Sequence, residues 1–219
     1  MEQYLATQQD FLSEIFVEMD LESAILHLKK DSILENIIQN ASVKPFTPSG
    51  NVYFNLLNSI VSQQLSVKAA DTIFNRFCTL FPEKYPSPEL LLVTDPGQLR
   101  ATGLSRQKAS YLQNVANYAL ENKIEAVKWD HYDDTQIIQM LTKIKGVGRW
   151  TVEMILMFTL GRPDVFPKDD LGIQQAIIRL YNLNTVGKDL HREMTEIAEP
   201  WRPYRTVACR YLWHWKNQN

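Results

Sequence analysis

The stretch IKGVGRWT, residues 144–151, places two glycines two positions apart between segments whose apolar residues recur at helical spacing. A turn between two helices usually needs one residue with positive φ, and a single glycine at a helix C-terminus supplies it. A second glycine at the start of the next helix leaves backbone N–H groups uncovered at the positive end of the helix dipole. The stretch therefore predicts a tight turn whose amides suit a phosphate. A corner that needs both glycines only for packing is the alternative.

The segments on both sides of this turn also favour helices, and no alternating strand pattern occurs in the chain, which predicts an all-α fold. Two stretches, KPFTPSG (44–50) and RPDVFPKDD (162–170), should be irregular because each contains two prolines. The first expected helix is capped by Asp20 and carries Ile25, Leu28, Ile33, Leu34 and Ile37. Another runs from Asp133 or Asp134 to Lys145. The remaining expected helices are 52–61, 66–81, the short stretches PELLLV and PGQLRAT, 106–121, 151–161, and about 171–182, 188–199 and 202–216.

Composition narrows the class of protein. Of the 219 residues, 45% are hydrophobic and 22% are charged, which is typical of a globular chain and not of a disordered one. Two cysteines, Cys78 and Cys209, are too few for an all-cysteine zinc or iron–sulfur site, and the histidines show no metal-ligand spacing. No secretory signal or membrane-spanning apolar run is present, so we expect an intracellular protein: cytoplasm or nucleoid in a bacterium, nucleus in a eukaryote.

Charge is unevenly distributed along the chain. Residues 1–50 contain three Lys/Arg and eight Asp/Glu, whereas residues 201–219 contain four Lys/Arg and no acid. The C-terminal half is therefore where a polyanion is expected to bind.

The residues around the two glycines, namely Leu141, Ile144, Gly146, Val147, Gly148 and Thr151, resemble the helix-hairpin-helix motif of DNA glycosylases. That motif grips the DNA backbone, and phosphate contacts position a protein without reading the base sequence. The resemblance implies backbone contacts at Gly146, Val147, Gly148, Arg149 and Thr151. It also implies a hairpin able to hold a monovalent cation on its carbonyls, with no other cofactor and no metal held by side chains.

A second string, VFPKDDLGI (165–173), is similar to the double-acid signature of the alkylation-repair branch of these glycosylases. By that resemblance Asp170 is the catalytic acid and Asp169 its less certain neighbour. One carboxylate near C1′ can stabilise an oxocarbenium-like transition state and orient a water. The alternative is that either acid simply caps the following helix.

Two departures separate the chain from sister branches. Bifunctional relatives carry a lysine two residues after the second glycine, where this chain has Trp150, so no amine is available there for a Schiff base. The iron–sulfur cluster of other relatives cannot be built from two cysteines. The resemblance therefore implies a monofunctional glycosylase.

The stretch FNLLNSIVSQQLSVKAADTIFNRF (54–77) is similar to the family segment that fills the gap left by an extruded base, with Gln64 at the wedge and Ser66 just after it. Trp150 is the best candidate for the base pocket, and PWRPYRTVACRYLWHW (200–215), which resembles the family C-terminus, adds Tyr204 and Trp213 as weaker ones. An exposed helix end for Gln64 and a core position for Trp150 are the alternatives.

These strings follow one another in family order, so the chain is identified as a member of the helix-hairpin-helix (HhH-GPD) glycosylases, in the 3-methyladenine DNA glycosylase II branch. The resemblance implies a barrel lobe at 52–160, a second lobe from 1–51 and 161–219, and no N-terminal β lobe. The expected activity is hydrolytic removal of 3-methyladenine and 7-methylguanine from duplex DNA by a protein with no membrane partner that need only be a monomer. A non-catalytic hairpin DNA-binding protein, or a glycosylase for hypoxanthine, uracil or mismatched thymine, remains the alternative.

Overall fold

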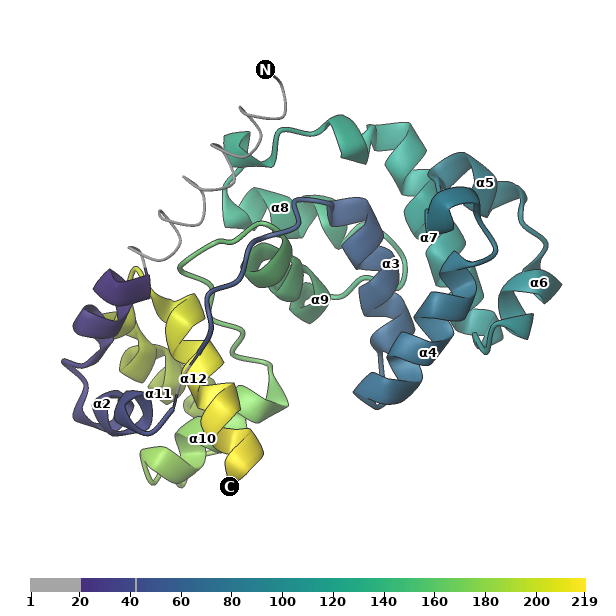
Figure 1. Ribbon diagram of the computed structural model, residues 1–219. Helices are drawn as coiled ribbons and strands as arrows, with labels where there is room; N and C mark the ends of the chain where they lie inside the picture. Colours follow the sequence, from purple (N-terminus) through teal and green to yellow (C-terminus); the bar gives the residue numbers. More distant parts are fainter. Residues whose placement is uncertain (1–20, 42) are drawn as a thin grey trace, which may run out of the picture. The chain divides into compact units, whose positions relative to one another are not determined.

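The computed structural model describes residues 21–41 and 43–219, and these residues form helices and connecting loops with no β-strand (Figure 1). The predicted all-α class is confirmed. The chain divides into two compact units. The first, called here the hairpin unit, is Ser49–Leu160; the second, called the Asp170 unit, combines the described residues before Ser49 with Gly161–Asn219. No helix within the described residues is long and apolar enough to cross a bilayer.

The hairpin unit is built around α3, whose apolar residues are almost all buried. Helix α3 packs on α4 and α7, and α5 and α6 also pack on α7 (Figure 1). A π-helical turn at Ile155–Thr159 continues α9. The α-helices of this unit are α3 (Val52–Ser62), α4 (Val67–Cys78), α5 (Pro88–Val93), α6 (Pro96–Ala101), α7 (Arg106–Asn122), α8 (Asp134–Leu141) and α9 (Arg149–Met154).

Side-chain caps set the starts of several of these helices, two of them at positions that the sequence predicts. The hydroxyl of Ser66 accepts the N–H of Ala69 and begins α4. Asp133, rather than Asp134, caps α8 in a capping box with Gln136, in which each side chain accepts the other residue's N–H. Each cap satisfies N–H groups that have no partner inside the helix.

The Asp170 unit contains a helical segment at 21–28 followed by α2 (Ser32–Gln39), α10 (Leu171–Leu180), α11 (Gly187–Ala198) and α12 (Arg205–Gln218). The expected single helix through Ile25 and Ile37 is wrong, because Asp31 interrupts it. One oxygen of Asp31 accepts the N–H groups of Ile33 and Leu34, which starts a new helix. Its other oxygen accepts bonds from the Tyr181 hydroxyl at 2.7 Å and the Trp201 indole at 3.0 Å. The expected cap Asp20 lies outside the described residues.

The segment before Asp170 is irregular, as predicted, and is fastened to the start of α12. The guanidinium of Arg205 binds both carboxylate oxygens of Asp164, at 2.6 and 2.9 Å. The hydroxyl of Thr206 donates to the carbonyl of Arg162 at 2.7 Å and accepts the N–H of Val165 at 3.1 Å. These bonds fix the chain that leads to Asp170, because they hold it at several points.

Candidate functional site

The first glycine of the hairpin is required by the fold of its own unit. Gly146 has φ +104°, a value that side chains rarely adopt. A Cβ at this position would also lie 2.4 Å from Cγ of Tyr111, on α7. Both the backbone angle and the close approach of the ring therefore need glycine here.

The second glycine is not explained in this way. Gly148 precedes α9 with φ −92° and ψ 168°, which is ordinary extended backbone, and no side chain caps the helix there. A Cβ added to Gly148 would meet nothing within 4 Å, and the residue is exposed. The unit would accept a side chain at this position, so packing within the unit does not explain the glycine.

The remaining hairpin residues differ in whether their side chains are exposed or buried. The side chain of Arg149 is 57% exposed and its Nε donates to Glu153 at 2.8 Å, while Glu153 is almost fully buried. Glu153 thus orients the guanidinium of Arg149, a role that the sequence did not indicate. Val147 and Thr151 are buried, so contacts to a ligand from these two residues would come from their backbone. No group of three metal-ligating side chains occurs within residues 21–41 and 43–219.

The turn that contains the wedge candidate lies beside the hairpin. Gln64 is exposed and has φ +57°. Its neighbour Gln63 donates from Nε2 to the carbonyl of Gly146 at 3.2 Å, which connects the two features directly. Ser66 acts as the cap of α4 and is exposed.

A depression of about 670 Å³ lies on the hairpin unit, with Trp150 on its wall at 42% exposure. Trp150 is therefore not a core residue, and its role in a base pocket stays a prediction. Three polar residues of α3 on the same wall, Asn58, Ser59 and Ser62, were not predicted, although their clustering on one face of a mostly apolar helix is a signal. The lining consists of Asn58, Ser59, Ser62, Gln63, Gln64, Leu65, Gly148, Trp150, Thr151 and Met154.

In the other unit, Asp170 caps α10 and is held by two donors. The N–H of Ile173 donates to Oδ1 at 2.8 Å. The indole N–H of Trp213, on α12, donates to the same oxygen at 2.8 Å. Gly172 leaves the space for this contact, because a Cβ there would lie 3.1 Å from both Asp170 Oδ1 and Trp213 Cδ1. Asp170 is therefore a half-buried carboxylate with a fixed direction.

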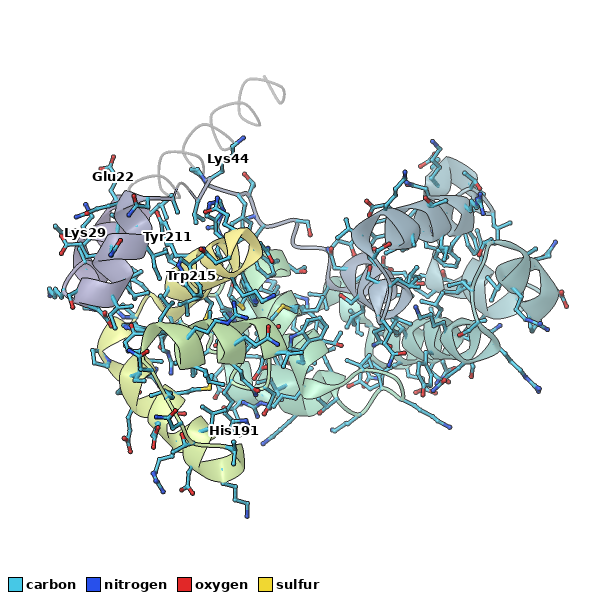
Figure 2. All side chains as sticks on the ribbon, turned by 90° about the horizontal axis from the view of Figure 1, so that it is seen from below. Glu22, Lys29, Lys44, His191, Tyr211 and Trp215 are labelled. Carbon is cyan, nitrogen blue, oxygen red and sulfur yellow. The ribbon has the colours of Figure 1, made fainter. Side chains whose placement is uncertain are left out.

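Its neighbour Asp169 is exposed, and its Oδ1 lies 3.6 Å from Nε2 of His191 on α11. The side chain of His191 is labelled in Figure 2. His191 in turn lies 3.3 Å from the amide of Gln174, whose Nε2 donates to the carbonyl of Lys168 at 2.9 Å. Of the two acids, only Asp170 has its carboxylate bound by both a backbone amide and an indole among the described contacts.

The C-terminal pocket candidates take different positions in the Asp170 unit. The indole N–H of Trp213 donates to Asp170, so the contact that this side chain makes in the structure is with the acid. Its place in a base pocket stays a prediction. Tyr204 is half-buried, with its ring edge-to-face against His27 at 5.5 Å.

The three arginines near the C-terminus make contacts within the Asp170 unit. Arg202 and Arg205 both bind Asp164. Arg210 lies over the Phe46 ring, 4.7 Å from its centre, donates to the carbonyl of Lys44, and has its pKa lowered by burial. All three arginines therefore make contacts inside the unit, and binding of a polyanion by the C-terminal half stays a prediction.

An all-helical chain with a two-glycine hairpin in one unit and an acid at the start of α10 in the other has the features of a helix-hairpin-helix DNA repair protein. The family model of the HhH-GPD superfamily of base excision DNA repair proteins matches residues 57–203. The chain belongs to this superfamily.

Similar proteins cover most of the chain. The alkylbase DNA glycosidase-like protein mag2 of Schizosaccharomyces pombe is 32% identical over 202 residues, which are 90% of this chain and 94% of that protein. DNA-3-methyladenine glycosylase 1 of the same yeast is 37% identical over 163 residues, 74% of this chain and 71% of that protein. The structure of the S. pombe 3-methyladenine DNA glycosylase Mag1 in complex with abasic DNA superimposes with a TM-score of 0.76 at 34% identity, covering 87% of this chain and 95% of that one.

Proposed function

We propose that the protein is a monofunctional DNA glycosylase that hydrolyses the N-glycosidic bond of alkylated purines, 3-methyladenine and 7-methylguanine, in duplex DNA and so initiates base excision repair. The observation that carries the proposal is Asp170, fixed on one oxygen by the amide of Ile173 and the indole of Trp213. Relatives named DNA-3-methyladenine glycosylase support the choice of substrate.

One oriented carboxylate is sufficient for this chemistry. An alkylated purine ring is often already cationic, so it leaves with less help from an acid than an undamaged base would need. As the bond to C1′ breaks, the sugar develops positive charge that a nearby carboxylate stabilises, and the same group can accept a proton from the attacking water. The products are the free base and an abasic sugar, and no covalent bond to the protein forms.

The hairpin unit supplies the binding part of the proposal. The open position at Gly148 gives a phosphate access to backbone amides, and the exposed cation of Arg149 lies in the next position. Trp150 and the polar face of α3 border a hollow of about 670 Å³, an ordinary size for a pocket that takes one aromatic ring system. An electron-poor purine ring is attracted to the face of a tryptophan.

The test is release of free bases from methylated duplex DNA, separated by chromatography. The Asp170→Asn variant should bind DNA but release no 3-methyladenine, because asparagine has the same shape and caps helices as well as aspartate but lacks the charge. Asp169→Asn is the matched control, because it removes the exposed neighbouring acid and should release base at nearly the wild-type rate.

Two other results would replace the proposal. If wild type and Asp170→Asn both bind duplex DNA and neither releases a base, Asp170 serves only as a helix cap, and the protein is a non-catalytic DNA-binding module or acts on another lesion. Release of hypoxanthine, uracil or mismatched thymine in place of methylated purines, in a panel of defined duplexes, would change the substrate and keep the class of enzyme.

A further inference from the structure

The turn that contains Gln64 has an unusual backbone for its sequence. The N–H of Leu65 donates to the carbonyl of Ser62 at 3.2 Å, which closes a four-residue turn. Gln63 has φ −51° and ψ 127°, and Gln64 follows with φ +57°, which are the angles of a type II turn. That turn favours glycine or asparagine at the position of Gln64, because only small or special residues adopt positive φ readily. The conformation of Gln64 therefore has to be held by its surroundings.

The ammonium of Lys108 holds one side of this turn. Its Nζ donates to the carbonyls of Val61 and Gln63, both at 2.7 Å. These carbonyls lie at the C-terminal end of α3, where a positive charge is favoured by the helix dipole. Lys108 is itself fixed near the start of α7, since its N–H donates to the hydroxyl of Ser105 at 3.1 Å. The ammonium is half-buried, and burial lowers the pKa of Lys108.

The side chain of Gln63 holds the other side of the turn. It donates to the carbonyl of Gly146, the first glycine of the hairpin, at 3.2 Å. Gln64 lies between these two attachments with its own side chain exposed, and it borders the same depression as Gly148. The turn is thus bonded to α7 and to the hairpin at the same time.

We propose that Lys108 and Gln63 are positioning residues, which hold Gln64 in its strained conformation so that it enters the gap left by an extruded base as the hairpin grips the backbone. The inference rests on the proposed function and adds to it two residues that need not touch DNA. A side chain whose backbone is already fixed loses less conformational freedom on insertion, so less binding free energy is spent on ordering it.

Two duplexes test the inference through single-turnover release of 7-methylguanine, one with the lesion paired to cytosine and one with it opposite an abasic analogue. A lesion without a partner is already easier to extrude, so it depends less on a wedge. Lys108→Met should slow release from the paired duplex by at least about tenfold, since two hydrogen bonds to a charged group are lost, and should leave release from the unpaired one near wild type. Gln64→Ala should show the same pattern.

Three further variants sharpen the result. Lys108→Arg can still donate two hydrogen bonds and should restore most of the rate. The double variant of Lys108→Met with Gln64→Ala should be no slower than Gln64→Ala, because the two changes act through one side chain. Lys128→Met removes an exposed lysine of the same unit and is the control for lost charge. If Lys108→Met does not fold in urea-unfolding assays, Gln63→Ala takes its place with the same expected pattern.

A fluorescence measurement that does not depend on base release separates a failure of this inference from a failure of the proposed function. A 2-aminopurine placed beside the lesion brightens when the stack opens on protein binding, and Lys108→Met should reduce that rise as much as Gln64→Ala does. If the wild type opens the stack but releases no base, the proposed function fails and this signal still decides the inference. Equal losses on the two duplexes, or a Lys108→Met variant that behaves like Lys128→Met, would overturn it.

Discussion

Replacing Trp213 with phenylalanine tests how the proposed catalytic acid is held. The change keeps an aromatic ring against Gly172 but removes the N–H that donates to Asp170 Oδ1 at 2.8 Å. A hydrogen bond to a charged group contributes about 1.5–3 kcal/mol. Ile173 still donates to the same oxygen at 2.8 Å, so Asp170 retains one of these two anchors. We therefore expect the lower part of the range, a rate of base release about 10- to 30-fold below wild type.

The assay is single-turnover release of 3-methyladenine with enzyme in excess, so that the rate reports the chemical step. DNA affinity, measured in parallel by fluorescence anisotropy, should stay close to wild type, because the lost bond lies within the Asp170 unit and faces the acid. Urea unfolding of both proteins shows whether the change acts only by loosening the unit. If Trp213 positions Asp170, the rate of base release should fall while the DNA-binding and urea-unfolding curves stay nearly unchanged.

A double-mutant cycle decides whether Trp213 acts through Asp170. In an Asp170→Asn background the charged acceptor is absent, so adding Trp213→Phe should slow any residual release no further. Amide labelling with ¹⁵N should also show that Asp170→Asn moves the indole N–H signal of Trp213. A Trp213→Phe variant with the wild-type rate, or with an equal loss in both backgrounds, would refute the reasoning.

Other predictions concern the hairpin and the core of the Asp170 unit. Gly146→Ala should destabilise the protein by about 2–4 kcal/mol in urea unfolding, because positive φ and a Cβ 2.4 Å from Tyr111 both oppose it. Gly148→Ala should fold normally yet bind duplex DNA more weakly in anisotropy titrations, and wild-type affinity would contradict the proposed phosphate contact. Tyr181→Phe should cost about 1–3 kcal/mol, because the hydroxyl that donates to Asp31 is lost. Burial and the bond to Asp31 raise the pKa of Tyr181, so the folded state keeps that proton longer than the unfolded chain, and stability should fall as pH rises above about 10. Unfolding curves across that range should show a smaller alkaline loss for Tyr181→Phe.

The sequence predicted most of the helices because their signals are local. The hydroxyl of Ser66 and the carboxylate of Asp133 each cap the helix that follows within three residues. The break at Asp31 was missed, because the apolar positions continue in helical spacing on both sides of it. The break is stabilised in part by hydrogen bonds that Tyr181 and Trp201 donate to Asp31 from 150 and 170 residues away along the chain. No local pattern contains that information.

The same distinction applies to the candidate site. Asp170 could be proposed from a short string, since a helix cap and an acid in family order are visible in the sequence. Trp213 looked like one more aromatic for the pocket, and its bond to Asp170 spans 43 residues. The strained backbone of Gln64 was also hidden, because glutamine is not a residue that predicts positive φ. The residues proposed to contact DNA were therefore easier to predict from the sequence than the contacts that position them.

The two glycines of the hairpin now require two different explanations. Packing accounts for Gly146, because Tyr111 occupies the space of a Cβ and the backbone angle is one that glycine favours. Packing does not account for Gly148, whose φ of −92° any residue can adopt and whose Cβ would meet nothing. A corner that needed glycine only to close would need one glycine. The second is useful when another molecule approaches the backbone, and the pair of alanine variants separates the two roles: one should cost stability and the other DNA affinity.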